Sequence, residues 1–304
     1  MAVPRPRSDV PGRSIDPGRS RGYGGADMRS RRPLAALLVA GVLLSPTPAR
    51  AGMSSEVADG TLTVTGTDGN DVVQITCAGG DVTVNDRNPG TGRAACRDIG
   101  RIVVRALGGI DLVDLRGVLP VDFTALAGTR VVGGGGEDTL YGSPFDDDLS
   151  GSDGNDRLYA SDGTDVLDGD GGSDDLRVET EGDVVLTDTS LTASEGSASI
   201  AAFEQVTLRS LGRAVRFDLR GFRGRTWAYG AAGPDVLLGG PGMSGLFGGP
   251  GADRLIGRDG EDYLFGNDGP DVLRGGGATD RMDGGPGRDD CSGGPDNDII
   301  VGCP

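Results

Sequence analysis

The chain has 304 residues and a net charge of −17, and all 29 of its basic residues are arginine. It contains no histidine, which excludes a Ser-His-Asp triad, a Cys-His pair and a His-ligated zinc site. Residues 52–304 carry 20 Arg against 43 acidic residues, a balance that disfavours nucleic acids and anionic membranes as partners.

The first segment with a clear pattern is residues 28–51, MRSRRPLAALLVAGVLLSPTPARA. Arginines precede an apolar run over residues 34–44, and small residues stand at positions 49 and 51. This order predicts a secretory signal peptide cleaved after Ala51, because the apolar run is too short to span a bilayer. The alternative interpretation is a buried helix or an anchor. Residues 1–27 precede a second Met, and we expect them to be a disordered upstream extension.

Nine-residue repeats follow a strand-rich section at residues 52–132. Array 1, residues 133–177, reads GGGGEDTLY, GSPFDDDLS, GSDGNDRLY, ASDGTDVLD and GDGGSDDLR. Array 2, residues 230–301, reads GAAGPDVLL, GGPGMSGLF, GGPGADRLI, GRDGEDYLF, GNDGPDVLR, GGGATDRMD, GGPGRDDCS and GGPDNDIIV. A fixed short period over thirteen units is typical of a solenoid rather than of a disordered linker.

Three positions of the repeat are nearly constant. The first is Gly in all units except the one that starts at Ala160, and the eighth is apolar in all thirteen, from Leu140 to Ile300. The sixth is Asp in all units except at Ser244, and these aspartates are Asp138, Asp147, Asp156, Asp165, Asp174, Asp235, Asp253, Asp262, Asp271, Asp280, Asp289 and Asp298. An early unit, GTDGNDVVQ at residues 66–74, places Asp71 at the same position.

Each position has a physical reason. Glycines adopt positive φ and leave carbonyl oxygens uncovered, so the first six residues form a tight turn. The aspartate adds a carboxylate, and a ligand set made only of oxygens suits Ca²⁺. Residues seven to nine form a short strand whose middle residue points inward. If two units make one coil, aspartates 18 residues apart stack, and their charges repel unless cations lie between them.

The pattern resembles the GGxGxDxUx repeat of the RTX, or hemolysin-type calcium-binding, family. The resemblance covers both arrays. It implies an all-β, right-handed parallel β-roll or β-helix solenoid that binds several Ca²⁺ ions between successive coils. The implied ligands are the position-six aspartates and the carbonyls of loop glycines, among them Gly133, Gly151, Gly169, Gly248, Gly257 and Gly266. At most about three sites in array 1 and six in array 2 are expected, with weaker sites near Ser244, Pro144 and Phe145.

Residues 178–229 form a second strand-rich section. It aligns with the section before array 1 at an offset of 104 residues, for example in the Asp-Leu-Arg-Gly sequences that begin at Asp114 and Asp218. We therefore expect two copies of one module, each a β-helical section followed by an array, within one continuous solenoid. Array 2 is followed by the last residues, 302–304.

The four cysteines are Cys77, Cys96, Cys291 and Cys303. An even count in an exported chain suggests disulfides, and proximity in the sequence favours Cys77–Cys96 and Cys291–Cys303. Free buried thiols are the alternative, most plausibly at Cys291, because this residue takes the inward eighth position.

The leading functional hypothesis is a secreted calcium-binding protein that folds on Ca²⁺ binding after export and has a structural or interaction role, not an enzymatic one. The arrays and their flanks fill residues 52–304, which leaves little room for a separate catalytic domain. One alternative is a polysaccharide lyase or epimerase built on the solenoid, with Tyr229, Arg225 and Asp218 as candidate groups. Another is a structural solenoid that needs no calcium. Contact with a cell surface or a polysaccharide stays open.

Overall fold

The structure is a computed structural model that describes residues 52–304. The predicted upstream extension and signal peptide lie outside the described residues. Within residues 52–304 the chain forms β-strands and one 3-10 helix, η1 (Cys96–Asp98), and no α-helix. None of the helical structure described there could cross a membrane.

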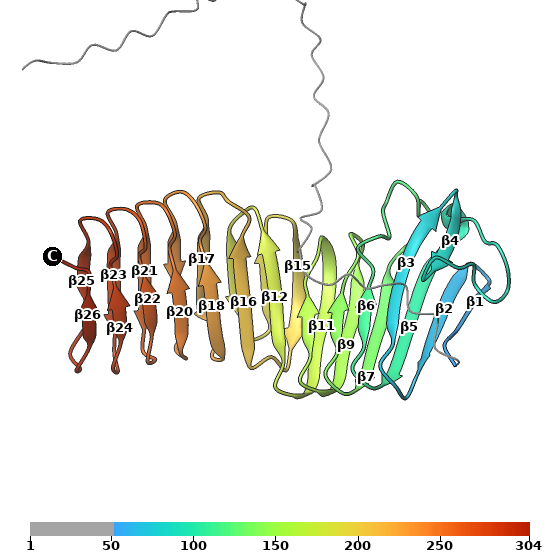
Figure 1. Ribbon diagram of the computed structural model, residues 1–304, viewed down its shortest axis with the longest axis horizontal. Coiled ribbons are helices and arrows are strands. Elements are labelled where there is room, and N and C mark those ends of the chain that lie inside the picture. The colour runs from blue at the N-terminus through green and yellow to red at the C-terminus, as the bar shows by residue number, and fades with distance from the viewer. Residues whose placement is uncertain (1–51) are drawn as a thin grey trace, which may run out of the picture. The chain divides into compact units, whose positions relative to one another are not determined.

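The strands build two sheets that face each other along the solenoid (Figure 1). In spatial order, the 14-stranded sheet contains β1 (Ser54–Ala58), β2 (Thr61–Thr67), β5 (Arg101–Gly108), β7 (Thr129–Gly135), β9 (Asp147–Gly154), β11 (Gly163–Gly172), β15 (Gly196–Ala201), β14 (Ser190–Ala193), β13 (Val184–Thr187), β17 (Arg216–Gly221), β19 (Val236–Leu238), β21 (Arg254–Arg258), β23 (Val272–Gly276) and β25 (Asp290–Ser292). The 12-stranded sheet contains β26 (Ile299–Val301), β24 (Arg281–Asp283), β22 (Tyr263–Phe265), β20 (Ser244–Phe247), β18 (Arg225–Tyr229), β16 (Gln205–Ser210), β12 (Asp175–Thr180), β10 (Arg157–Tyr159), β8 (Thr139–Tyr141), β6 (Leu112–Asp114), β3 (Val72–Ala78) and β4 (Asp81–Val84).

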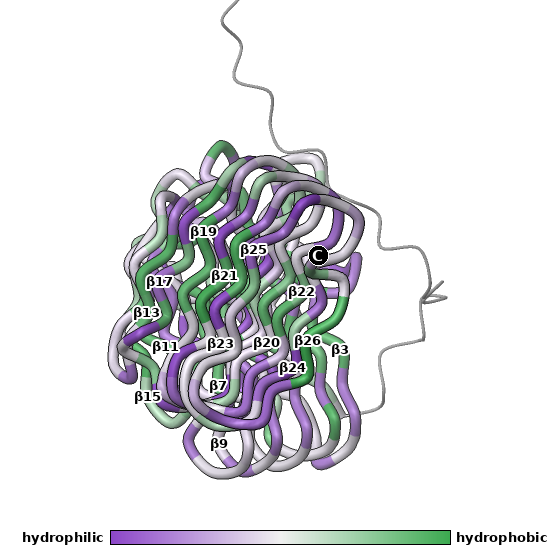
Figure 2. The backbone as a smooth tube through the Cα atoms, turned by 90° about the vertical axis from the view of Figure 1, so that its left-hand side faces the viewer, coloured by the Kyte–Doolittle hydropathy of each residue, from purple (hydrophilic) through white to green (hydrophobic). Residues whose placement is uncertain are grey.

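Successive nonapeptides alternate between the two sheets, so two units make one coil, as the sequence predicted. The parallel pairs match residues 18 apart, for example Leu140 with Leu158 and Leu158 with Leu176. Figure 2 looks along the stack of coils and shows hydrophobic residues recurring along the strands and hydrophilic residues gathered in the turns. The fold is therefore the parallel β-roll solenoid that the resemblance implied.

The core lies between the two sheets, and in the arrays each unit but the last contributes its position-eight side chain to it. Position eight is buried in eleven consecutive units, from Leu140 to Met282, and Cys291 packs against the same core. The prediction is wrong for Ile300, which is 42% exposed. Its strand β26 pairs only with β24, so no further coil covers this side chain.

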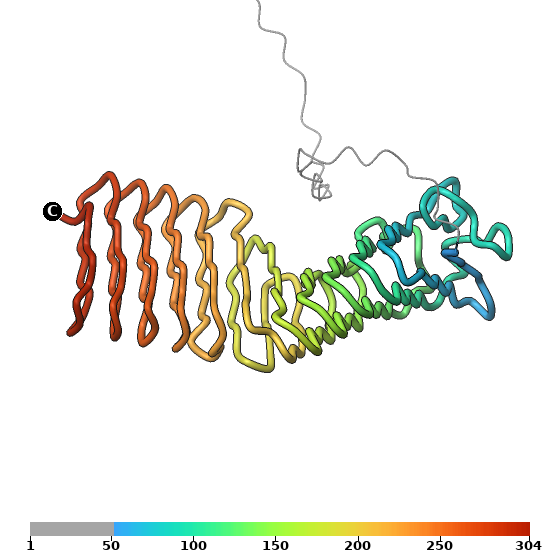
Figure 3. Tube along the Cα trace, turned by 60° about the horizontal axis from the view of Figure 1, so that its bottom comes forward, coloured from blue at the N-terminus to red at the C-terminus, as the bar shows by residue number. Residues whose placement is uncertain are grey.

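Three strands between the arrays depart from the simple coil. β15 pairs with β11 in parallel, then β14 and β13 follow as antiparallel neighbours, and β13 pairs with β17 in parallel. In the opposite sheet only β16 lies between β12 and β18. The 14-stranded sheet thus gains two extra strand spacings, or about 10 Å, and the trace of residues 52–304 changes direction there (Figure 3). The sequence predicted strands here but not their antiparallel pairing.

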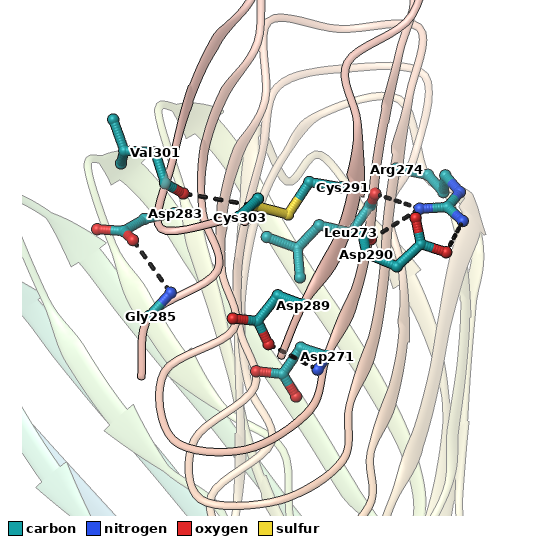
Figure 4. Close-up of a disulfide and its surroundings, with 10 residues drawn as sticks. All are labelled: Asp271, Leu273, Arg274, Asp283, Gly285, Asp289, Asp290, Cys291, Val301 and Cys303. Atoms are coloured by element: carbon teal, nitrogen blue, oxygen red, sulfur yellow. Dashed lines mark hydrogen bonds and ion pairs between the residues drawn. A yellow bond between two sulfur atoms is a disulfide. The ribbon is translucent and has the colours of Figure 1, made fainter. Parts of the chain in front are cut away.

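Both predicted disulfides are present, so the free-thiol alternative is wrong. Cys77 on β3 pairs with Cys96 in η1, and Cys291 on β25 pairs with Cys303. Each bridge lies near one end of the described stack, where strands lack a second neighbour. Figure 4 shows the Cys291–Cys303 bridge in one view with Asp271 and Asp289 of array 2.

The segments that align at an offset of 104 residues have the same local structure in opposite sheets. Arg116 pairs with Asp114 on β6, and Arg220 pairs with Asp218 on β17, each through Nε and Nη2. The leucine between the two charged residues is buried in both copies. The copies are therefore displaced by half a coil.

Candidate metal centre

The position-six aspartates form ladders that run along the turns of the roll. Their side chains point inward, and one oxygen, Oδ1, accepts a hydrogen bond from the backbone N–H of the equivalent residue one coil earlier. The distances are 2.7 Å from Asp138 to Asp156 and 2.8 Å from Asp156 to Asp174. Figure 4 shows the same bond, 2.9 Å long, from Asp271 to Asp289.

The second oxygen of most of these carboxylates is buried without a hydrogen-bond donor. Among the described residues this holds for Oδ2 of Asp111, Asp138, Asp156, Asp174, Asp235, Asp253, Asp262, Asp271, Asp280 and Asp289. A buried carboxylate oxygen without a partner is costly, since the charge has lost its water. The same defect repeated in register indicates a ligand common to all of these turns.

Carbonyl oxygens of the next coil border the same space. A methyl group added to Gly133 would collide with Oδ2 of Asp138 and would lie 2.7 Å from the carbonyl oxygen of Gly151. A methyl group on Gly248 would likewise meet Asp253 and lie 2.8 Å from the carbonyl oxygen of Gly266. The first glycine of the repeat is thus required to keep an oxygen-lined space open between coils.

The other glycines predicted from the family occupy the same kind of position. Gly151, Gly169, Gly257 and Gly266 each border Oδ2 of the aspartate in their own unit and a carbonyl oxygen from the following coil. The residues present therefore fit a hard cation such as Ca²⁺, which takes only oxygen ligands. Within residues 52–304 no group of three or more His, Cys, Asp or Glu side chains converges, so carbonyl oxygens would supply much of the ligand set.

Burial raises the pKa of most of these carboxyl groups, because the interior disfavours their charged form. The pKa is raised to about 7 for Asp253 and Asp262, and to about 6 for Asp156, Asp235 and Asp280. Repulsion from neighbouring aspartates in the ladder adds to the effect of burial, as Asp138 and Asp174 do for Asp156. A bound cation would relieve both causes.

Two predicted ligands in array 1 have a different environment. Asp147 Oδ1 accepts hydrogen bonds from the hydroxyls of Thr129 and Ser143, and its Oδ2 accepts from Ser143 N–H at 2.7 Å and Ser161 Oγ at 3.0 Å. Asp165 accepts from Asp147 N–H and, at 3.5 Å, from Ser161. Protein donors thus bond to Oδ2 of Asp147 and Asp165, the atom that lacks a partner in most other position-six aspartates.

Two further predicted positions also differ from the common pattern. Ser244 is fully buried and keeps the ladder bond to Asp262 through its backbone N–H, at 2.7 Å, but it supplies a hydroxyl in place of a carboxylate. Asp298 is only half-buried, and its Oδ1 accepts from Asp280 N–H at 2.9 Å. The unit that begins at Gly239 is therefore the least suited to a cation in array 2.

Sequence reasoning missed Asp111, whose pKa burial raises to about 7. Asp111 continues the ladder of array 1, since its N–H donates to Asp138 at 2.8 Å and its Oδ1 accepts from Asp71 N–H at 2.6 Å. The signal in the sequence is ALGGIDLVD, a degenerate unit with Gly109 at position four and Val113 at position eight. Its first two residues are Ala106 and Leu107, and this apolar start departs from the family pattern.

The candidate enzymatic groups do not form a site. Asp218 lies on β17 in the 14-stranded sheet and pairs with Arg220, which lowers its pKa. Arg225 and Tyr229 lie on β18 in the 12-stranded sheet. The structure therefore separates the acid from the other two residues.

Comparison with known families agrees with this geometry. The model of the RTX calcium-binding nonapeptide repeat matches the chain in four copies, at residues 129–144, 141–176, 246–273 and 265–300. These matches fall within or beside the two arrays, so the chain carries RTX calcium-binding repeats, as the sequence predicted. The search among curated proteins found no match.

Proposed function

We propose that this chain is a secreted protein that binds several Ca²⁺ ions between its coils and folds on binding them after export. The observation that carries the proposal is the register of buried, partnerless Oδ2 atoms in both arrays. The fold without metal contains uncompensated carboxylates, and Ca²⁺ would stabilise it because it binds the folded state alone.

The ligands we assign are Oδ2 of the position-six aspartates, with carbonyl oxygens of the next coil. Asp138, Asp156 and Asp174 serve array 1. Array 2 uses Asp235, Asp253, Asp262, Asp271, Asp280, Asp289 and Asp298. Asp147 and Asp165 are weaker candidates, because hydroxyl groups compete with a cation for their carboxylate oxygens.

The physiological role we propose is structural or interactive. The low cytosolic Ca²⁺ concentration would leave the chain poorly ordered before export, and extracellular modules commonly bind Ca²⁺ at roughly 10⁻⁴–10⁻³ M. Support comes from the predicted signal peptide and from the large share of the described chain that the repeats occupy.

The test is a Ca²⁺ titration of the purified protein, followed by circular dichroism and calorimetry, with Mg²⁺ as the control ion. We expect a cooperative gain of β-structure with several Ca²⁺ ions bound and little response to Mg²⁺. Asp156→Asn is expected to lower the stoichiometry, whereas Asp98→Asn, at an exposed carboxylate outside the arrays, is expected to leave it unchanged. A protein that is fully folded in EDTA and indifferent to Ca²⁺ would contradict the proposal.

A further inference from the structure

The two outer faces of the roll differ in a way that the core does not require. Every Tyr and the single Trp within residues 52–304 point outward from the 12-stranded sheet, and these are Tyr141, Tyr159, Trp227, Tyr229 and Tyr263. Phe247 and Phe265 join them there. No strand of the 14-stranded sheet carries an outward aromatic side chain in the described part of the chain.

Five of these residues form one continuous strip over β18, β20 and β22. Tyr229, Phe247 and Phe265 stack at centroid distances of 4.7 and 5.1 Å. Trp227 lies 6.3 Å from Phe247, and Tyr263 is 39% exposed. We refer to Trp227, Tyr229, Phe247, Tyr263 and Phe265 as the aromatic strip.

Gly245 makes part of this arrangement possible. It pairs with Trp227 on one side and Tyr263 on the other. A side chain at Gly245 would collide with the indole of Trp227, and its Cβ would lie 3.2 Å from Cδ2. The glycine therefore lets the indole lie over the neighbouring strand.

Arginines without ion-pair partners border the aromatic strip, although the chain is strongly acidic. Arg209, Arg225 and Arg281 are exposed, and none of them makes a salt bridge to another described residue. Arg209 lies 5.7 Å from the ring of Tyr229. Glu179 lies opposite Arg209 at one end, and Asp283 lies opposite Phe265 at the other and already accepts a bond from Gly285 N–H at 3.1 Å.

On the corresponding surface of array 1, most arginines form ion pairs. Tyr141 and Tyr159 stack at 4.1 Å, but the adjacent Arg116 pairs with Asp114 and Arg177 pairs with Asp175. Arg157 on β10 is the one exposed arginine beside these two rings without a salt bridge to a described residue, whereas the strip over β16 to β24 combines five rings with three such arginines. These five strands extend for about 19 Å along the solenoid.

We propose that the aromatic strip and Arg209, Arg225 and Arg281 bind a linear acidic glycan whose sugars carry carboxylates. The arginine fork matches a carboxylate through two parallel hydrogen bonds. The ring edges of the strip contact the apolar C–H surface of sugar rings, and removing this surface from water is favourable. The length of the strip along one axis suits an extended polymer.

The stacking geometry favours a glycan over single-stranded nucleic acid. Nucleic acid binding of this type requires ring faces that are open to the bases. In the ladder from Tyr229 to Phe265 the rings cover one another's faces and present their edges to solvent. Ring edges carry the positive part of the aromatic quadrupole, which also favours an anionic ligand.

The test uses the fluorescence of Trp227, the only tryptophan of the chain. The protein in Ca²⁺ is titrated with hyaluronan oligosaccharides and with oligogalacturonate, and with neutral dextran and oligothymidine as controls. We expect a saturable change with at least one uronate glycan, weakened by salt because the contacts are ionic, and none with dextran or oligothymidine.

Variants separate the strip from the rest of the surface. Arg225→Gln with Arg281→Gln is expected to weaken glycan binding about tenfold or more, since each arginine contributes a charged hydrogen bond. Arg254→Gln, at an exposed arginine of the 14-stranded sheet, is the matched control and should bind like the unaltered protein. Tyr263→Ala should also weaken binding.

Three results would overturn the proposal: no saturable response to either uronate glycan, equal binding by the double arginine variant, or tighter binding of oligothymidine. Circular dichroism in Ca²⁺ is recorded for every variant. A failure of calcium-dependent folding would appear there, and it is distinguishable from a folded protein that ignores the glycan.

Discussion

Array 1 and array 2 carry the same aspartate at the same repeat position but surround it differently. In array 2, partnerless Oδ2 atoms occur in turns that lead into both sheets, for example at Asp253 and Asp262. In array 1 they occur only in turns that lead into the 12-stranded sheet. In the other turns of array 1, Ser143 and Ser161 donate to Asp147.

The comparison teaches that a hydroxyl at position two changes the role of position six where it contacts the carboxylate, whereas Ser152 at the same position contacts Ser150 and leaves Oδ2 of Asp156 without a partner. Ser143 and Ser161 both stand at position two, 18 residues apart, so their hydroxyls reach the same carboxylate from adjacent coils. No unit of array 2 has a hydroxyl residue at that position. A carboxylate with four donors is satisfied within the protein, whereas one with a buried, partnerless oxygen is left available to a cation.

The largest effect that tests this comparison is the pH dependence of the metal-free protein. The folded-state pKa of Asp253 and Asp262 is about 7, above the ordinary value, so the folded chain binds more protons than the unfolded chain between about pH 4 and 7. Stability in EDTA should therefore fall as pH rises through this window. Ca²⁺ competes with these protons, so stability in Ca²⁺ should rise with pH.

Denaturant unfolding at pH 5 and pH 8, each with EDTA and with Ca²⁺, measures this reversal. Hydrogen exchange localises it, and amides around Asp147 should keep protection longest at pH 8, because burial raises the pKa of this group but its hydroxyl donors offset part of the rise. Equal stability at both pH values in EDTA would show that the charge on the partnerless Oδ2 atoms does not destabilise the metal-free fold.

The next effect compares the same substitution in the two environments. Asp262→Asn removes an uncompensated charge, so it should stabilise the protein in EDTA at pH 8 and destabilise it in Ca²⁺. Asp147→Asn removes acceptors for buried donors and should cost about 1–3 kcal/mol under both conditions. Urea unfolding curves of the two variants measure the difference, and parallel behaviour of both would mean that the two aspartates have one role.

The smallest effect concerns the unit that lacks a carboxylate. Ser244→Asp restores position six of the repeat next to Asp262. We expect about one additional Ca²⁺ ion by calorimetry and a modest loss of stability in EDTA, because a further buried charge is added. Ser173→Ala, at an exposed serine of array 1, should change neither quantity. An unchanged stoichiometry for Ser244→Asp would place the missing ligands elsewhere in that turn.

The sequence was sufficient to predict the coil and most of the ladder, because both follow from a fixed period. A nine-residue repeat with an apolar eighth residue predicts one short strand per unit, with successive strands in opposite sheets. The pairing of Leu140 with Leu158, 18 residues apart, confirms this prediction. The disulfides followed from proximity along the chain.

The remaining features depend on contacts between units that no single unit specifies. The hydroxyl cluster at Asp147 draws on Thr129, Ser143 and Ser161, which lie in three different coil segments. Asp111 joins the ladder from a unit that begins with Ala106 instead of Gly. β14 pairs with β13 and β15 in antiparallel orientation. Its residues alternate between buried and exposed as those of an ordinary coil strand do, so periodicity alone does not distinguish the two cases.

The 18-residue register also limits how such a gene could grow or shrink. Duplication of two nonapeptides adds one coil and leaves every later strand in its own sheet, as the pairing of Leu246 with Leu264 indicates. Duplication of a single nonapeptide would exchange the sheets for everything that follows. Trp227 and Arg281 would then belong to opposite faces if the new unit lay between them. Between Trp227 and Arg281, changes in repeat number should therefore keep the outer face intact in even steps and divide it in odd ones.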